Sequence, residues 1–163
     1  MNYRIFLLLG SNQGDPLRNL GDAAANIEND VGRILDRSAL YKSGAWGMEA
    51  QPDFFNQVLN IASTFSPDVL LKKLLAIEEK MGRVRVKKWG PRLIDIDILF
   101  YGDEVIETPS LHIPHPGIPQ RRFTLVPLVE IAPDLVHPVS GKTMRELLAE
   151  CEDTLKVKKE SGD

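Results

Sequence analysis

The side chains whose types and spacing are best suited to chemistry lie between positions 83 and 99. Two carboxylates, Asp95 and Asp97, follow a cluster of five cationic residues that falls within ten positions. The cluster consists of Arg83, Arg85, Lys87, Lys88 and Arg92, and Trp89 stands among them. Surface cations beside paired acids contribute little to the stability of a fold, whereas both groups are useful around a metal-bound polyphosphate.

The two carboxylates lie in a segment, residues 93–99, whose isoleucines and leucines predict a β-strand. Side chains alternate between the faces of a strand, so Asp95 and Asp97 share one face with Cα atoms about 6.7 Å apart. Like charges on one face repel, and aspartate is depleted in strands. A divalent cation removes this penalty, because Mg²⁺ takes one or two protein carboxylates and completes its shell with water and phosphate oxygens. The alternative interpretation is a strand with a solvated acidic face.

The cationic cluster predicts a loop that binds a small anion. Arginine presents a planar fork that matches phosphate oxygens, and Trp89 would either stack on a base or anchor the loop. The formal charge of the whole chain is −3, whereas a nucleic-acid-binding surface is normally larger and more basic overall. We therefore expect no nucleic-acid partner.

Familiar glycine-rich phosphate loops do not explain the chemistry. The sequence Gly141-Lys142-Thr143 resembles the end of a P-loop, but the glycine required five residues earlier is replaced by Val136. Phosphate binding is therefore expected to depend on side chains and a metal rather than on a glycine cradle.

Length and composition predict a single domain of ordinary globular type. The chain has 163 residues, of which 43% are hydrophobic and 26% are charged. Cys151 is the one cysteine, so no disulfide can form within the chain. The apolar run at residues 5–9 is too short to span a bilayer and lacks the flanks of a signal peptide. We predict a cytoplasmic protein with one domain over residues 1–158 and a charged tail over residues 159–163. Fraying of the charged C-terminal end is expected to begin at residue 156.

Hydrophobic periodicity predicts the order of the elements. A helix is expected after the N-cap Asp15, and another after Ser66, since each is followed by proline and an amphipathic pattern. Thr143 and Glu146 form a capping box for a late helix. The predicted strands cover residues 3–9, 33–42, 55–65 and 93–99, with a short hairpin strand at 105–106.

The resulting order, β-α-β-β-α-β, is that of the ferredoxin-like arrangement. We therefore predict an α+β domain in which both helices lie on one face of an antiparallel sheet, with additional helices toward the C-terminus. The other face of the sheet would be free for a site. The fold by itself does not indicate a function, because it hosts many unrelated ones.

Several segments of the chain, taken together, resemble one family. In order, they are Leu9-Gly10-Ser11-Asn12, Gln51-Pro52-Asp53-Phe54-Phe55-Asn56, Gly82-Arg83-Val84-Arg85, Trp89-Gly90-Pro91-Arg92, Ile94-Asp95-Ile96-Asp97-Ile98-Leu99, Ile113-Pro114-His115-Pro116, Arg121 with Phe123, Leu125, Pro127 and Leu128, and Ile131-Ala132-Pro133. They closely resemble the 6-hydroxymethyl-7,8-dihydropterin pyrophosphokinase family of folate biosynthesis, over about residues 9–148. The resemblance implies that the pterin hydroxyl attacks the β-phosphorus of ATP, giving AMP and the pterin diphosphate.

The resemblance also implies a role for each matching residue. Asp95 and Asp97 would hold two Mg²⁺ ions on the triphosphate and, with Arg83 and Arg92, would form the catalytic set. The residues implied at the nucleotide are Glu78, Arg83, Arg85, Trp89, Arg92, His115 and Arg121. The residues implied at the pterin are Ser43, Gly44, Trp46, Phe54, Asn56, Trp89 and Phe123, with the phenylalanines stacking on the ring and Asn56 bonding its polar edge. The chain departs from the family at residues 43–46, where a turn with threonine and proline is usual.

Ordinary structural roles remain open for several of these side chains. Phe54 or Phe123 could belong to the core, His115 could be an inert loop residue, Asn56 could cap a turn and Glu78 could be a solvated helix acid. Two other functional classes fit less well. A ligand-sensing domain of similar shape would not explain two acids beside five cations. An RNA-binding module should carry an RNP1-like strand, and the sequence contains none.

Overall fold

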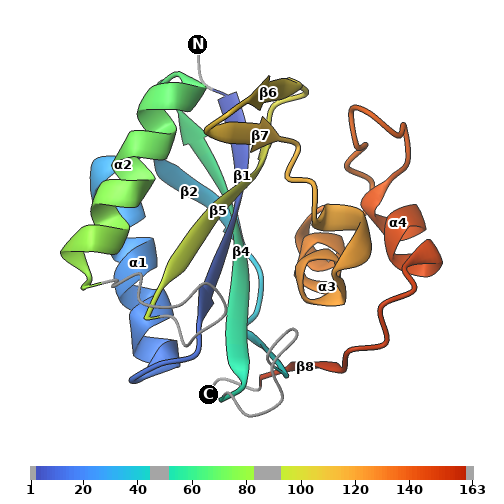
Figure 1. Cartoon of the computed structure of the whole chain (residues 1–163), viewed down its shortest axis with the longest axis horizontal. Helices are drawn as coiled ribbons and strands as arrows, with labels where there is room; N and C mark the ends of the chain where they lie inside the picture. The colour runs from blue at the N-terminus through green and yellow to red at the C-terminus, as the bar shows by residue number, and fades with distance from the viewer. Residues whose placement is uncertain (1–2, 45–51, 83–92, 161–163) are drawn as a thin grey trace.

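The computed structural model describes residues 3–44, 52–82 and 93–160 (Figure 1). In chain order, the described elements are β1 (Tyr3–Ser11), α1 (Pro16–Asp30), β2 (Arg33–Arg37), β3 (Tyr41–Ser43), β4 (Phe54–Ser63), α2 (Pro67–Lys80), β5 (Asp95–Tyr101), β6 (Ile106–Thr108), β7 (Leu111–Ile113), the 3-10 helix η1 (Ile118–Gln120), α3 (Arg122–Ile131), α4 (Met144–Glu150) and β8 (Val157–Lys159).

The main sheet has the strand order β5-β1-β4-β3-β8, and β2 pairs with β4 as well. Every strand pair in this sheet is antiparallel. Strands β1 and β4 are central, with β5 beside β1 and β2 beside β4, which is the strand order of the predicted β-α-β-β-α-β arrangement. The α+β class and the ferredoxin-like core are confirmed.

The predicted strand at residues 33–42 is two strands, because the chain leaves the ladder at Ser38. There the backbone N–H of Ser38 donates to the carbonyl of Val58 (2.9 Å), while the Ser38 hydroxyl accepts from the N–H of Val58 (2.9 Å). The side chain thus takes the place of a backbone carbonyl at this point. As a result, β2 pairs with the second half of β4 and β3 with its first half.

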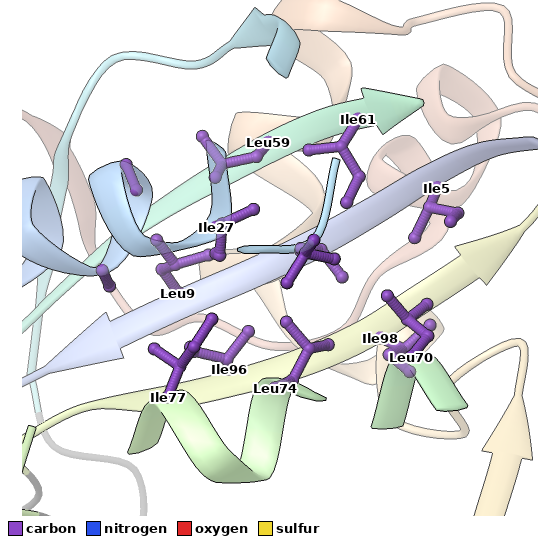
Figure 2. Close-up of a cluster of buried hydrophobic side chains, with 14 of the residues drawn as sticks. Ile5, Leu9, Ile27, Leu59, Ile61, Leu70, Leu74, Ile77, Ile96 and Ile98 are labelled. Carbon is purple, nitrogen blue, oxygen red and sulfur yellow. The ribbon is translucent and has the colours of Figure 1, made fainter. Parts of the chain in front are cut away.

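Helices α1 and α2 cover one face of the sheet, as predicted. Helix α1 follows its N-cap Asp15, whose carboxylate accepts from the N–H of Arg18, and both helices begin with proline. Figure 2 shows the core that they form with strands β1, β4 and β5. Its labelled members are Ile5, Leu9, Ile27, Leu59, Ile61, Leu70, Leu74, Ile77, Ile96 and Ile98.

The opposite face of the sheet is partly covered by helices, so the prediction that this face is free for a site is wrong. Helices α3 and α4 pack there on a second core (Figure 1), which includes Phe6, Leu8 and Phe100 of the sheet, Leu125 and Leu128 of α3, and Met144 and Leu147 of α4. The capping box between Thr143 and Glu146 that predicted α4 is present. Helix α3 was not located from the sequence, because Pro127 lies inside it and proline usually ends a helix.

Strand β8 lies where a frayed tail was predicted, and for residues 157–159 that prediction is wrong. Backbone pairing with β3 orders this segment, and such pairing does not depend on the charge of the lysine side chains. The hairpin strand predicted at residues 105–106 is shifted to β6, which pairs with β7. Among the described residues, no helix has the length and apolar character needed to cross a membrane.

Candidate functional site

Four neighbouring strands place one residue each in a single row across the sheet. The strand registers pair Tyr41 with Asn56, Asn56 with Gly10, and Gly10 with Asp95. The row lies on the face that α3 covers, since the hydroxyl of Tyr41 donates to Glu130 of that helix (2.6 Å). Adjacent strands are about 4.8 Å apart, so the backbones at Asn56 and Asp95 are separated by roughly 10 Å. The candidate site is built on this row.

Gly10 belongs to the motif at residues 9–12, but the sequence predicted no role for it, and Tyr41 was not found from the sequence. A Cβ atom at this position would lie 2.7 Å from the side-chain nitrogen of Asn56. Only glycine at this position therefore lets the Asn56 amide lie across β1 toward β5, the strand that carries Asp95 and Asp97. The available signal was a glycine inside an otherwise apolar strand, which often marks a close approach to a strand.

Asn56 is buried, with 4% of its surface exposed. Its side-chain N–H₂ donates to the carbonyl of Leu9 (3.2 Å), whereas no donor among the described residues bonds its buried Oδ1. An unsatisfied buried acceptor destabilises a folded protein by about 1–3 kcal/mol. The residue pairs in the body of β4, so it is not the turn cap considered above. The arrangement fits a ligand that presents an N–H donor to this oxygen.

Asp95 and Asp97 share one face of β5, as predicted from the alternation. Both are half-buried, and the intervening Ile96 points into the core beneath α1 and α2. Asp97 pairs with Leu8, which belongs to the core of the α3 face. Among the described residues, no third carboxylate, histidine or cysteine joins them. Two hard oxygen donors suit Mg²⁺, which takes few protein ligands when phosphate oxygens are available.

Glu78 is buried, with 5% of its surface exposed, so it is not a solvated helix acid. Its Oε2 accepts a hydrogen bond from the backbone N–H of Ile96 (2.7 Å), the residue that lies between the two aspartates in the sequence. Because β5 is at the edge of the sheet, that N–H has no strand partner on its outer side. Glu78 thus holds β5 at the point where both carboxylates project.

His115 lies beside β5, since its backbone N–H donates to the carbonyl of Leu99 (3.0 Å). Its Nδ1 accepts the N–H of Gly117 (3.0 Å), which leaves the proton of the neutral ring on Nε2. Burial lowers the pKa of His115 to about 4, with smaller contributions from the charges of Arg121 and His112. The ring is therefore a neutral hydrogen-bond donor at pH 7.

Arg121 and Phe123 lie at the N-terminus of α3. The guanidinium carbon of Arg121 is 5.7 Å from the centre of the Phe123 ring. A Cβ at Gly117 would lie 2.8 Å from Nε of Arg121, so the arginine side chain lies against that glycine. Phe123 packs partly against the core of the α3 face, and some of its surface remains exposed. The structure thus brings a cation, a neutral imidazole donor and an aromatic ring to one region.

The remaining described residues of the predicted pterin set lie at the adjoining ends of β3 and β4. Phe54 is half-buried and, two residues before Asn56, shares its face of the strand. It pairs with the buried Ser43, and Gly44 follows. Trp46 and the predicted nucleotide residues Arg83, Arg85, Trp89 and Arg92 lie outside the described residues.

A cavity of about 480 Å³ opens at the same end of the sheet but on the other face. Its lining includes Lys42 and Phe55, whose neighbours Tyr41 and Phe54 alternate to the α3 face. Among the predicted site residues that the structure describes, none lines it. The predicted site therefore coincides with the row across the sheet and not with this cavity.

Comparison with known proteins identifies the family of this chain. The family model for 7,8-dihydro-6-hydroxymethylpterin-pyrophosphokinase (HPPK) matches residues 6–133. A 2-amino-4-hydroxy-6-hydroxymethyldihydropteridine pyrophosphokinase from Synechocystis sp. is 47% identical over 147 residues, which cover 90% of this chain and 75% of that protein. A protein of the same name from Aquifex aeolicus is 43% identical over 152 residues, covering 93% of both chains.

Solved structures show the same fold. An HPPK-DHPS structure in complex with substrates superposes with a TM-score of 0.73 at 15% identity, over 92% of this chain and 43% of that one. The wild-type Plasmodium falciparum HPPK-DHPS with pteroate gives a TM-score of 0.74 at 18% identity, over 92% of this chain and 42% of that one. The chain thus spans less than half the length of these two proteins.

Proposed function

Because the chain belongs to the 7,8-dihydro-6-hydroxymethylpterin-pyrophosphokinase family, it is an ATP-using pyrophosphokinase of folate biosynthesis, and we propose how its residues bind and orient the substrates. The substrates are MgATP and 6-hydroxymethyl-7,8-dihydropterin. The hydroxymethyl oxygen forms a bond to the β-phosphorus and its proton passes to solvent. The bond from that phosphorus to the α-phosphate oxygen breaks, and AMP leaves. The products are AMP and the pterin diphosphate.

The row from Asn56 through Gly10 to Asp95 is the observation that carries this proposal. The unpartnered Oδ1 of Asn56 accepts an N–H from the polar edge of the pterin. The pterin lies beside the Asn56 amide, which extends over Gly10 because that residue has no side chain. Its hydroxymethyl group then reaches toward Asp95 and Asp97, since the row spans roughly 10 Å. The two substrates therefore meet at β5.

The walls of the pterin site are aromatic. Phe123 of α3 and Phe54 of β4 stack on the ring, and backbone groups of Ser43 and Gly44 complete the recognition of its edge. A flat heterocycle gains about 1–3 kcal/mol from stacking on an aromatic side chain, by analogy with nucleic-acid bases. Trp46 and Trp89 are proposed for the same site from the family resemblance alone.

Asp95 and Asp97 are proposed to hold two Mg²⁺ ions. Bound there, the ions would offset the charge of the triphosphate and the charge that develops during transfer. Glu78 stabilises this arrangement, because its hydrogen bond from the N–H of Ile96 holds strand β5 between the two aspartates. The proposed assignment of Glu78 to the nucleotide site is retained from the family resemblance.

His115 and Arg121 are proposed to bind phosphate oxygens. The neutral His115 donates from Nε2, because its Nδ1 is already occupied by the N–H of Gly117. Arg121 adds a permanent positive charge whose side chain is held against Gly117. Arg83, Arg85 and Arg92 supply the further cations. Since phosphoryl transfer depends on positioning and charge stabilisation, these fixed donors contribute to the rate. The cytoplasmic location and the lack of a nucleic-acid partner stay predictions.

The test is a product analysis. The protein is incubated with MgATP, with and without the pterin, and all phosphorylated products are measured by mass spectrometry. We expect AMP and pterin diphosphate in equal amounts, with neither formed when the pterin is omitted. ADP together with a pterin monophosphate would show that the β-phosphorus is not the atom attacked. An Asn56→Ala variant with undiminished pterin affinity would show that the row is not the pterin site.

A further inference from the structure

The segment after α4 lies beyond the residues that the family model matches, yet it contacts three parts of the proposed pterin site. Between Cys151 and Lys158 its residues alternate between half-buried and exposed. The half-buried members are Cys151, Asp153, Leu155 and Val157. This period of two shows an extended segment with one side against the protein, although only its end pairs as β8.

Asp153 contacts the first residue of α3. Its Oδ2 accepts the backbone N–H of Arg122 (2.9 Å), while its Oδ1 accepts the N–H of Leu155 (2.9 Å). The N-cap of α3 is Arg121, which supplies no side-chain hydrogen bond, and the first turn contains no acidic residue. Asp153 therefore supplies the carboxylate that a helix N-terminus normally obtains from its own sequence.

The following residues contact the strand on the other side of the site. Leu155 Cδ1 lies 3.5 Å from the point where a Cβ on Gly44 would stand. Val157 then pairs with Ser43, and the pairing continues to Tyr41. The segment thus runs from the helix end that carries Phe123 to the strand that carries Ser43.

A second contact holds the far end of α3 to the same strand region. Oε1 of Glu130 accepts from the hydroxyl of Tyr41 (2.6 Å) and from the N–H of Ala39 (3.0 Å). With Asp153 at one end of the helix and Glu130 at the other, the position of α3 relative to β3 is set at both ends. The position of Phe123 relative to Asn56 follows from it.

We propose that residues 151–159 are a strap that sets the width of the pterin site, and that Asp153 is a positioning residue acting through the first turn of α3. This inference rests on the proposed placement of the pterin between Phe123 and β4. The nucleotide residues should be affected less. The side chain of Arg121 lies against Gly117, and His115 is hydrogen-bonded to Gly117 and Leu99, neither of which belongs to the strap.

The experiment compares Asp153→Ala with Asp153→Asn, and uses Glu152→Ala as the matched control, because Glu152 is the exposed neighbour on the strap. Pterin affinity is measured by fluorescence titration in the presence of a non-hydrolysable MgATP analogue, and the analogue's own affinity is measured separately. Steady-state kcat and both KM values are determined well below the melting temperature of each variant.

We expect Asp153→Ala to weaken pterin affinity about tenfold, the loss that removal of a helix cap implies when it is transmitted to the site. Affinity for the nucleotide analogue should change by less than about twofold. Asp153→Asn, which keeps an acceptor oxygen, should recover most of the loss, and Glu152→Ala should match the unmodified protein. If Asp153→Ala does not fold, Leu155→Ala carries the test, with the same selective loss expected.

Two results would overturn the inference in different ways. Unchanged pterin affinity in Asp153→Ala, or equal losses for pterin and nucleotide, would show that the strap has only a general structural role. A Phe123→Ala variant measured in parallel tests the premise. If its pterin affinity is unchanged, the placement of the pterin is wrong and the inference falls with it. A loss of pterin affinity in Phe123→Ala without one in Asp153→Ala would support the placement of the pterin and contradict the proposed role of the strap.

Discussion

At the scale of single residues, the proposed site consists of polar groups whose surroundings bound substrates would complete. Asn56 has a buried acceptor without a partner, and Asp95 and Asp97 place like charges on one strand face. His115 is neutral because burial favours its uncharged form. The unsatisfied oxygen of Asn56 carries a free-energy penalty in the unliganded protein, and each of the three arrangements can be tested by removing one group.

Asn56→Ala is expected to separate binding from stability. Pterin affinity should fall about threefold to tenfold, because one hydrogen bond to the ligand is lost. The free energy of unfolding should change by less than about 1 kcal/mol, since the loss of the bond to Leu9 is offset by removal of the unsatisfied Oδ1. Titration with pterin and urea unfolding measure the two effects. A large loss of stability with unchanged affinity would contradict the assignment.

Asp97→Ala is expected to lower the turnover rate about 10³-fold, because an oxygen ligand of the proposed metal site is lost and phosphate charge is left uncompensated. The fold should survive, as the side chain is half-buried rather than part of a core. Turnover is measured against Mg²⁺ concentration, with circular dichroism as the control for folding. Near-normal turnover, or unfolding of this variant, would refute the two-carboxylate site.

The lowered pKa of His115 predicts a loss of stability in acid. The unfolded protein binds a proton on this ring near pH 6.5, whereas the folded protein binds it only near pH 4. Stability is therefore full above pH 6.5 and falls by up to about 3 kcal/mol as the pH drops to 4. Urea unfolding across this range measures the effect. His115→Gln should show a flatter pH dependence, with His137, whose pKa is also lowered by burial, contributing in the same direction.

At the scale of the elements, the position of α3 decides whether the site is assembled. This helix carries Phe123 and is held to β3 through Glu130, which accepts from Tyr41 and Ala39. Burial and then the hydrogen bond and charge of Glu130 raise the pKa of Tyr41 well above its usual value. The hydroxyl thus stays protonated and continues to donate across the working pH range of the protein.

Tyr41→Phe is expected to lower the free energy of unfolding by about 1.5–3 kcal/mol, because a hydrogen bond to a carboxylate is lost. Since the folded pKa of Tyr41 lies above the unfolded value, its contribution is present below pH 10 and is lost at more alkaline pH. Urea unfolding at pH 7 and at pH 10.5 should show a difference from the unmodified protein that shrinks at the higher pH. Lys42→Ala, on the same strand but facing the other way, should change stability by less than about 0.5 kcal/mol at pH 7.

At the scale of the whole molecule, one sheet separates two cores. The core beneath α1 and α2 contains Leu74, while the core beneath α3 and α4 contains Leu128. Strands β1, β4 and β5 contribute side chains to both, because alternate residues point to opposite faces. The two cores therefore share the same backbone and should unfold together.

Leu74→Ala and Leu128→Ala are each expected to lower the free energy of unfolding by about 2–5 kcal/mol, the usual effect of a cavity in a core. Both variants should still unfold in a single transition by circular dichroism and by fluorescence. Only Leu128→Ala should also weaken pterin binding, because its core supports α3. Two separate transitions, or equal pterin losses in both variants, would contradict a shared cooperative unit.

The local elements and the chemistry were accessible from the sequence. Alternation along β5 placed Asp95 and Asp97 on one face, and capping residues located α1, α2 and α4. These features depend on interactions between residues close in the chain, so their pattern is visible in the order of the amino acids. The family was accessible too, because its motifs are short and specific.

Only the tertiary structure decided which residues share a row, a face or a helix end. The register of β3, β4, β1 and β5 brings Tyr41, Asn56, Gly10 and Asp95 together, and α3 covers a face that the strand pattern left open. The segment at residues 151–159, predicted in part as a frayed tail, is ordered by pairing with β3 and by the contact of Asp153 with α3. These contacts join residues that are distant in the chain, and their free energy comes from burial and backbone pairing that no local pattern encodes.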